Sequence, residues 1–569
     1  MNITFNRMTE KCSKKELIMK CKKTSLAFTL ITITTLFLPN TAFSKAEPAA
    51  TVFVTNYLQR GSTSTEPAPE ELIDKLSIFA APGEYEPVTV SIRAGVELKG
   101  LQVRLAHDLK NQDGETIPAS AVDIRLVDPF ESWTKNQIEC YLLAKTAVDV
   151  SAGTTRRFWI TIHIPADAKP GLYRSRLLIS KTITKLGPDL GRLDTIKELT
   201  YTVNVLPIKL ISAKETGMAF FMYNNTAYYS EDLVTEEYQM KVFEDMREHG
   251  MTTATAYLYP VVDGKFTLTG SDKTGLGFSQ TIEMLGKSDL VAPGVPIIWL
   301  GAEAYGPDVW KAVLDEGRKK NWPEMVFYAC DEPGDSERAK GVREFMGRFN
   351  AFREKNPQYD LRVTTALGSS RGIQVVGHYY DLWIGCMAQR IGESGVIADA
   401  KMRKKELWTY DCMQAPVDAE TDRYYYGIWA WVSGVKGCAH WAYYCQPHLS
   451  YVYPTKDRLI PSIGWEGVRE GVDDYRYLAT LRQLAEKAKS TGKAGLAKGA
   501  DKLFEEVKEM VTMDNYGKAY HKASELTTVE ENTAYHRPRV EPDLSIDAYD
   551  KMRLKVAKEI ENIATELSE

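Results

Sequence analysis

The chain has 569 residues, of which 44% are hydrophobic and 26% are charged. This length is too great for one compact core, so the composition predicts two or three folded units. The formal net charge of −5 provides no basic surface for a phosphate backbone, which excludes nucleic acid as the expected partner.

The first segment has the pattern of a secretory signal peptide. Lys20, Lys22 and Lys23 precede thirteen mostly apolar residues, 26–38, and small residues stand at positions 42 and 44. We therefore expect residues 1–44 to be removed near Ser44 and the protein to be exported to the periplasm, cell surface or medium. A membrane anchor is the alternative, but thirteen residues are fewer than the roughly twenty that span a bilayer, so no stable membrane span is expected.

Residues 45–210 alternate hydrophobic and polar side chains in short runs. In 158–164 every second residue is Phe or Ile, and Pro-Gly and Asp-Gly pairs separate the runs. Similar runs occupy 51–57, 87–94, 122–128, 171–180 and 199–206. Many short strands without intervening helices predict an N-terminal β-sandwich.

Residues 211–480 instead alternate apolar runs with amphipathic stretches, which is typical of a parallel sheet. The apolar runs are 218–223, 253–259, 295–300, 325–330, 361–366, 382–387, 407–410 and 438–444. The amphipathic stretches include 231–249, 308–320, 335–355 and 423–433. Eight strand and helix units predict a (β/α)8 TIM barrel, whose functional residues should lie at the carboxyl ends of its strands.

The last part of the chain, residues 481–569, is predicted to be a helical extension. Apolar residues recur three and four positions apart from residue 463 onward, which indicates one helical face. Further helices are expected near 496–513 and 543–568, packed on the outside of the barrel.

The cysteines and histidines do not predict a metal site. Six cysteines follow residue 44 without a CxxC pair, and the eight histidines are scattered, so we expect neither a metal nor another cofactor. Cys330, Cys386 and Cys438 fall in apolar runs and should be buried. Cys412 and Cys445 remain possible disulfide partners.

Two adjacent carboxylates follow the fourth apolar run. Asp331 and Glu332 come directly after residues 325–330, where a buried strand opens into a loop. An apolar strand end disfavours a charged carboxylate and so suits a general acid. The alternative is that both are ordinary loop acids before a helix capped by Asp335.

Polar and aromatic residues at the other strand ends favour the catalytic interpretation. They are Tyr223, Asn224, Tyr257, Glu303, Tyr410, Asp411, Trp441 and Tyr443. Aromatic faces beside carboxylates and amides suit a sugar, whose hydrogens stack on rings and whose hydroxyls need paired donors and acceptors. These residues are therefore predicted to bind a glycan.

The sequence resembles glycoside hydrolase family 123 and an overlapping, uncharacterised family. The resemblance covers most of the chain after residue 44 and rests on 157–159, 165–173, the Asp331-Glu332-Pro333 strand end, 434–441 and 461–475. Gly464 stands where relatives usually carry Arg. The family consists of β-N-acetylgalactosaminidases, so the resemblance implies an exo-acting enzyme that retains anomeric configuration through the 2-acetamido group of its own substrate.

Under that resemblance, Asp331 orients and polarises the acetamido group while Glu332 is the general acid and base. Strand-end position makes Tyr410 the candidate donor to the acetamido oxygen, with Trp441 and Tyr443 as walls. Two alternatives stay open. Glu303 and Glu332 could act as a two-carboxylate glycosidase on a sugar without the acetamido group, or the chain could be a non-catalytic carbohydrate-binding surface protein. The anomeric preference, the sugar, exo or endo action and the oligomeric state are not determined by the sequence.

Overall fold

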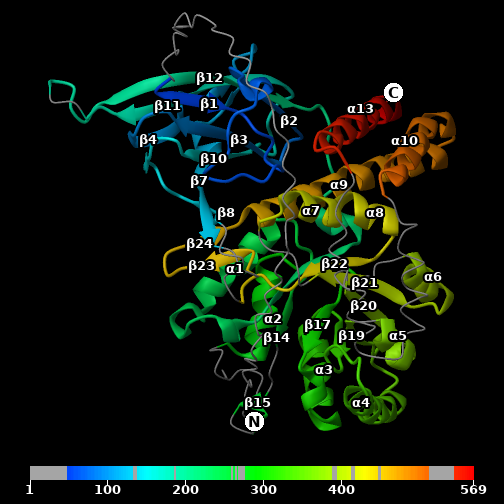
Figure 1. Ribbon diagram of the computed structural model, residues 1–569. Coiled ribbons are helices and arrows are strands. Elements are labelled where there is room, and N and C mark those ends of the chain that lie inside the picture. The colour runs from blue at the N-terminus through cyan, green and yellow to red at the C-terminus, as the bar shows by residue number, and fades with distance from the viewer. Residues whose placement is uncertain are drawn as a thin grey trace, which may run out of the picture. The chain divides into compact units, whose positions relative to one another are not determined.

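The computed structural model shows a mixed β and helical chain, in agreement with the coarse form of the predicted fold (Figure 1). It describes residues 48–131, 137–184, 187–257, 261–262, 265–266, 276–368, 370–386, 394–411, 417–445, 450–511 and 544–568. The expected signal peptide, residues 1–44, and Cys412 of the possible disulfide lie outside these ranges.

Two sheets form the N-terminal part, between residues 50 and 205. The first has the strand order β1-β3-β10-β7-β8, and the second has the order β2-β12-β11-β4-β9 with β5 and β6 beside it. Their bounds are β1 Ala50–Phe53, β2 Lys75–Ala80, β3 Tyr85–Ala94, β4 Leu98–Leu105, β5 Leu109–Lys110, β6 Thr116–Ile117, β7 Val122–Glu131, β8 Gln137–Leu143, β9 Val148–Val150, β10 Thr155–His163, β11 Gly171–Thr182 and β12 Leu193–Val205.

Alternation along β10 explains how the first sheet is buried on both faces. Phe158, Ile160 and Ile162 enter the core between the two sheets. Trp159 points to the other face, where its ring lies 5.6 Å from that of Tyr57 in the core shared with the C-terminal part. Because side chains alternate along the strand, one face of this sheet packs on the second sheet and the other packs on the C-terminal part.

Eight parallel strands form the next part, and their pairing closes from β22 back to β13. They are β13 Ala219–Asn224, β14 Thr255–Tyr257, β17 Ile297–Leu300, β18 Met325–Tyr328, β19 Val363–Leu367, β20 Leu382–Cys386, β21 Glu406–Asp411 and β22 Gly437–His440. Each of the eight predicted apolar runs contributes one strand. Because all the strands run in the same direction, their carboxyl ends share one rim.

The connecting segments include helices and two short hairpins. The helices are α1 Glu236–Glu248, α2 Phe278–Lys287, α3 Pro307–Lys320, α4 Ser336–Lys355, α5 Ser370–Val376, α6 Ser394–Met402, α7 Ala419–Tyr424 and α8 Ala430–Ser433. The hairpins pair β15 Val261–Val262 with β16 Lys265–Phe266, and β23 Val452–Pro454 with β24 Leu459–Pro461.

Three predicted elements have other bounds in the structure. The helix predicted over 231–249 begins at Glu236 because the Thr235 hydroxyl caps it, accepting from the backbone N–H of Tyr238 at 3.2 Å. The helix predicted over 423–433 begins earlier, after the Asp418 cap, and passes through the π-helical segment Tyr425–Trp429. The eighth apolar run, predicted to extend to residue 444, forms a strand only as far as His440.

Three long helices complete the described chain: α9 Ile463–Ser490, α10 Ala497–Glu509 and α13 Ala548–Ser568. α9 runs through residue 480, so the domain boundary expected there falls inside a helix. α10 and α13 pack on α9 and on each other. They therefore form a layer outside α9 and do not, as had been expected, pack directly on the strands. Within the described residues, no helix combines the length and the apolarity that a membrane crossing requires.

A buried ion network joins the N-terminal sheets to α9 and α13. Arg553 of α13 donates to Glu86 of β3 at 3.0 Å, and to Glu470 at 2.9 Å and Asp474 at 2.7 Å, both on α9. Arg423 of α7 also donates to Asp474, at 2.8 Å. Glu470 and Asp474 belong to the 461–475 segment that carries the family resemblance, so part of that motif has a structural role.

Candidate active site

A cavity of about 510 Å³ opens at the carboxyl rim of the eight strands. Its lining residues come from six strand ends: Tyr223, Leu300, Gly301, Glu303, Ala304, Tyr328, Asp331, Glu332, Ala366, Tyr410 and Trp441. Six of the predicted site residues therefore share this cavity, namely Asp331, Glu332, Tyr223, Glu303, Tyr410 and Trp441. Its size and its mixture of rings and carboxyl groups fit a small polar ligand.

The adjacent carboxylates each accept a hydrogen bond from a tyrosine. The Tyr328 hydroxyl donates to Oδ1 of Asp331 at 2.5 Å, and the Tyr410 hydroxyl donates to Oε1 of Glu332. Tyr410 was expected to serve the acetamido oxygen of a substrate, but in this structure its hydroxyl is directed to Glu332. A donor on one oxygen of each carboxyl group leaves the other oxygen for a ligand and holds the group in place.

The loop that carries the pair is held in an uncommon backbone conformation. Glu332 has φ of 43°, in the left-handed region that residues with a Cβ seldom adopt. Its carbonyl accepts hydrogen bonds from the backbone N–H of Gly334 at 2.8 Å and from Nη1 of Arg338 at 3.1 Å. A residue forced into this conformation by its surroundings is typical of functional sites.

Glu303 is a carboxyl group of the cavity that burial perturbs strongly. It lies in the short turn after β17, and its Oε2 is buried without a hydrogen-bond partner. Burial raises the pKa of Glu303 from its ordinary value of 4.5 to about 7, and the nearby Asp331 adds to the rise. Near neutral pH, Glu303 is therefore still partly protonated, and as a carboxylic acid it can donate a proton or a hydrogen bond.

We expect Glu303 to make folding stability depend on pH. The unfolded chain releases this proton near pH 4.5 and the folded chain near pH 7, so the stability contributed by Glu303 is complete below pH 4.5 and is lost as the pH rises to 7. Denaturant titrations across this interval should show a steeper fall for the wild type than for Glu303→Gln. The exposed Glu337→Gln is the control, and parallel profiles for wild type and Glu303→Gln would contradict the assignment.

The structure does not bring three other predicted residues into the lining of this cavity. The Asn224 amide is buried between Tyr229, which donates to its Oδ1 at 2.9 Å, and Gln239. Tyr443 is also buried, and its hydroxyl donates to Asp245 of α1 at 2.7 Å. Asp411 is buried at the end of β21. Strand-end position alone does not determine on which side of a strand a side chain lies.

Tyr257 lies on β14, but its side chain is outside what the structure describes.

Two residues of the site were not predicted from the sequence. Tyr328 is a hydroxyl-bearing residue in the otherwise apolar strand β18, and that single polar atom was the available signal. Gly368 follows β19, and a Cβ there would lie 2.8 Å from Cδ of Glu332. In the sequence, a glycine after a strand end does not indicate that another side chain packs closely against it.

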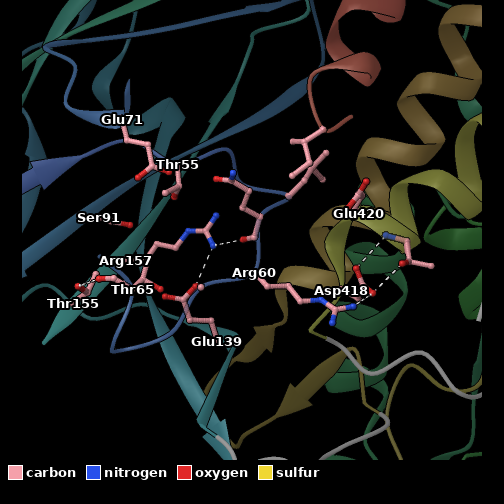
Figure 2. A pocket seen from close by; sticks show the side chains of 15 residues that line it. Thr55, Arg60, Thr65, Glu71, Ser91, Glu139, Thr155, Arg157, Asp418 and Glu420 are labelled. Carbon is pink, nitrogen blue, oxygen red and sulfur yellow. Dashed lines mark hydrogen bonds and ion pairs between the residues drawn. The ribbon is translucent and has the colours of Figure 1, made fainter. Parts of the chain in front are cut away.

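A second cavity, of about 470 Å³, lies between the N-terminal sheets and α7 (Figure 2). Arg157 donates there to Glu139 at 3.1 Å and to the carbonyl of Gln59 at 2.8 Å, and Arg60 forms an ion pair with Asp418. The described residues that line it include no aromatic ring. Its charged groups largely bond one another, so the cavity around Asp331 and Glu332 is the better candidate for chemistry.

No protein-family model and no curated protein sequence matches the chain. Among solved structures, a family 123 glycoside hydrolase from Clostridium perfringens is similar with a TM-score of 0.61 and 13% identity, covering 91% of this chain and 99% of that one. Gas2p from Saccharomyces cerevisiae, in complex with laminaritetraose and laminaripentaose, has a TM-score of 0.34 and 12% identity over 47% of this chain and 67% of its own. A β-glucuronidase from Bifidobacterium dentium has a TM-score of 0.26 and 12% identity over 75% and 67%.

The last two similarities are too low to carry an argument. The first spans nearly all of both chains, and at 13% identity it is a likeness of fold. The chain therefore shares its fold, as a distant structural relative, with a family 123 glycoside hydrolase.

Proposed function

We propose that this protein is a glycoside hydrolase that holds the terminal sugar of a glycan in the cavity around Asp331 and Glu332. The observation that carries the proposal is the adjacent pair itself. Two consecutive carboxylates line one cavity of about 510 Å³ at a strand end, and each accepts a tyrosine hydroxyl. The shared fold with a family 123 glycoside hydrolase supports the same conclusion.

Neighbouring carboxylates suit substrate-assisted catalysis better than the two-carboxylate scheme. In the latter, a nucleophile and an acid about 5 Å apart flank the scissile bond, usually from different strands. Here the substrate's 2-acetamido oxygen would attack the anomeric carbon while Asp331 accepts the amide N–H. Glu332 would protonate the leaving oxygen as its bond to the anomeric carbon breaks. Then, as a carboxylate, Glu332 would remove a proton from the water that attacks this carbon and displaces the acetamido oxygen. We therefore propose an exo-acting, retaining β-N-acetylgalactosaminidase.

Tyrosine contacts fit these two roles. The hydroxyl of Tyr410 on Oε1 of Glu332 stabilises the carboxylate that remains after proton donation, and it leaves Oε2 to carry the proton. The bond from Tyr328 to Asp331 orients the carboxylate that must meet the acetamido group. Trp441 and Tyr223 supply aromatic walls for the sugar.

A second candidate is a two-carboxylate glycosidase in which Glu303 is the acid and Glu332 the nucleophile. The raised pKa of Glu303, about 7, is the specific observation in its favour, because a general acid must hold its proton at the working pH. This enzyme would act on sugars with a free 2-hydroxyl.

We also propose that the two N-terminal sheets are a β-sandwich domain and that the ring from β13 to β22 is a (β/α)8 barrel. The closed pairing of eight parallel strands supports the barrel. Export after cleavage near Ser44 is proposed from the sequence pattern of residues 1–44.

The first test is hydrolysis of 4-nitrophenyl glycosides by the protein lacking residues 1–44. We expect release of 4-nitrophenol from the β-N-acetylgalactosaminide and none from β-galactoside, because only the former carries the internal nucleophile. The β-N-acetylglucosaminide reports how strictly the sugar is recognised. Release from β-galactoside would support the Glu303 and Glu332 scheme, and inactivity on every glycoside tested would count against hydrolysis.

A further inference from the structure

A row of aromatic rings leads from the cavity wall to the hairpin of β23 and β24. The ring of Trp441, which lines the cavity, lies 6.3 Å from that of Tyr228. Tyr229, the next residue, lies 5.0 Å from Tyr444, which lies 5.9 Å from Tyr453 of β23. We call Trp441, Tyr228, Tyr444 and Tyr453 the aromatic track.

The aromatic track includes exposed rings, whereas rings that only pack in a core would be buried. Tyr228 is 41% and Tyr453 is 37% exposed, and they are the two most exposed aromatic side chains in the described part of the chain. Tyr444 and Trp441 are half-buried. Tyr229, by contrast, is buried and contacts the ring of Tyr444. Exposed rings that recur along one path indicate a surface for a ligand more than they indicate packing.

The hairpin does not need Tyr453 for its own core. In β23, Val452 and Pro454 are buried and Tyr453 between them is exposed, as the alternation of a strand requires. The ring of Tyr453 also lies 6.1 Å from that of Tyr141 in β8, which extends the row to the first sheet beside the hairpin (Figure 1). Two exposed rings are far less than the surface of roughly 1,000 Å² that a specific protein partner needs.

We propose that the aromatic track binds the sugar units that follow the terminal sugar, so that the preferred ligand is an oligosaccharide. This inference rests on the proposed function, because it places the terminal sugar beside Asp331 and Glu332. Trp441, which forms a wall for the terminal sugar, is the start of the track, and the apolar faces of the following pyranose rings stack on Tyr228 at the cavity mouth and on Tyr444 and Tyr453 beyond it. The tyrosine hydroxyls remain available to sugar hydroxyls.

The test compares two substrates that share a terminal β-N-acetylgalactosamine: the 4-nitrophenyl monosaccharide and a tetrasaccharide. Tyr228→Ala and Tyr453→Ala should each lower kcat/KM for the tetrasaccharide by about 5- to 10-fold. Tyr453→Ala should leave it unchanged for the aryl glycoside, whereas Tyr228→Ala should lower it by a smaller factor, because the 4-nitrophenyl group reaches the cavity mouth. Tyr379→Ala is the matched control, because this half-buried tyrosine precedes β20 at the opposite end of the strands. Equal effects on both substrates, or none on either, would overturn the proposal.

A binding measurement separates failure of the track from failure of the enzymatic function. The dissociation constant of the tetrasaccharide is measured by calorimetry with Glu332→Gln, alone and combined with Tyr228→Ala or Tyr453→Ala. Weaker binding in the combined variants, about 5- to 10-fold, supports the track even if the wild type hydrolyses neither substrate. Undetectable binding, or equal binding by all variants, overturns it.

Discussion

Glu332→Gln is expected to lower kcat/KM by about 10²- to 10⁴-fold for glycosides with basic leaving groups. Glutamine keeps the shape of the side chain and can still accept the hydrogen bond from Tyr410, but it cannot transfer a proton to the departing oxygen. The loss should be much smaller for a 4-nitrophenyl glycoside, because 4-nitrophenolate leaves without protonation. The measurement is kcat/KM for β-N-acetylgalactosaminides whose leaving groups range from 4-nitrophenol to an alkyl alcohol.

The matched control is Glu337→Gln, which changes an exposed carboxylate in the first turn of α4. It should leave every rate unchanged. If Glu332→Gln loses the same factor for all leaving groups, Glu332 is not the acid. A leaving-group dependence that appears in Glu303→Gln instead would favour the two-carboxylate scheme, in which the carboxyl group with a pKa of about 7 donates the proton.

Arg553→Met is expected to lower the free energy of unfolding by about 3–5 kcal/mol. Arg553 is buried and bonds Glu86, Glu470 and Asp474. Removing Arg553 leaves buried carboxylates without a cation. The free energy lost in this way exceeds the net stabilisation that the intact ion pairs contribute. Guanidinium unfolding measures the loss, and Lys551→Met, at an exposed position on the same helix, should change stability by no more than about 0.5 kcal/mol.

The loss from Arg553→Met should also grow as the pH rises. Burial raises the pKa of Glu86 well above its ordinary value and raises that of Glu470, while the charge of Arg553 opposes both shifts. Without Arg553 these carboxyl groups take up protons more readily, and neutral carboxyl groups tolerate burial better than charged ones. A loss no larger than that of Lys551→Met, or one independent of pH, would show that the network does not hold the sheets against α9.

Much of the element order could be predicted because it is local. Apolar runs such as 325–330 and 382–387 are long enough to be recognised as buried strands, and each forms one. Element ends were less predictable, since they depend on caps and neighbours. The eighth run extends in sequence to residue 444, yet its strand ends at His440. α9 crosses the boundary expected at residue 480 because its face is buried along most of its length.

The candidate site, like the fold, has features that the sequence predicted and features that it did not. Asp331 and Glu332 were recognisable because two carboxylates follow an apolar strand, and Tyr410 and Trp441 because rings stand at strand ends. The side of the strand on which a residue lies was not recognisable. Asn224 and Tyr443 bond Tyr229 and Asp245 away from the cavity.

By itself, the sequence determined that this chain would have an N-terminal β region, a following α/β region and an acidic pair at a strand end, because period and spacing are properties of neighbouring residues. Only the tertiary structure decided which side chains meet. Glu303 owes its raised pKa to burial and to Asp331, 28 positions along the chain. Gly368 leaves room for Glu332, and the aromatic track joins residues as far apart as Tyr228 and Tyr453. Such contacts depend on how the closed strands bring distant residues to one rim, and no local pattern encodes that geometry.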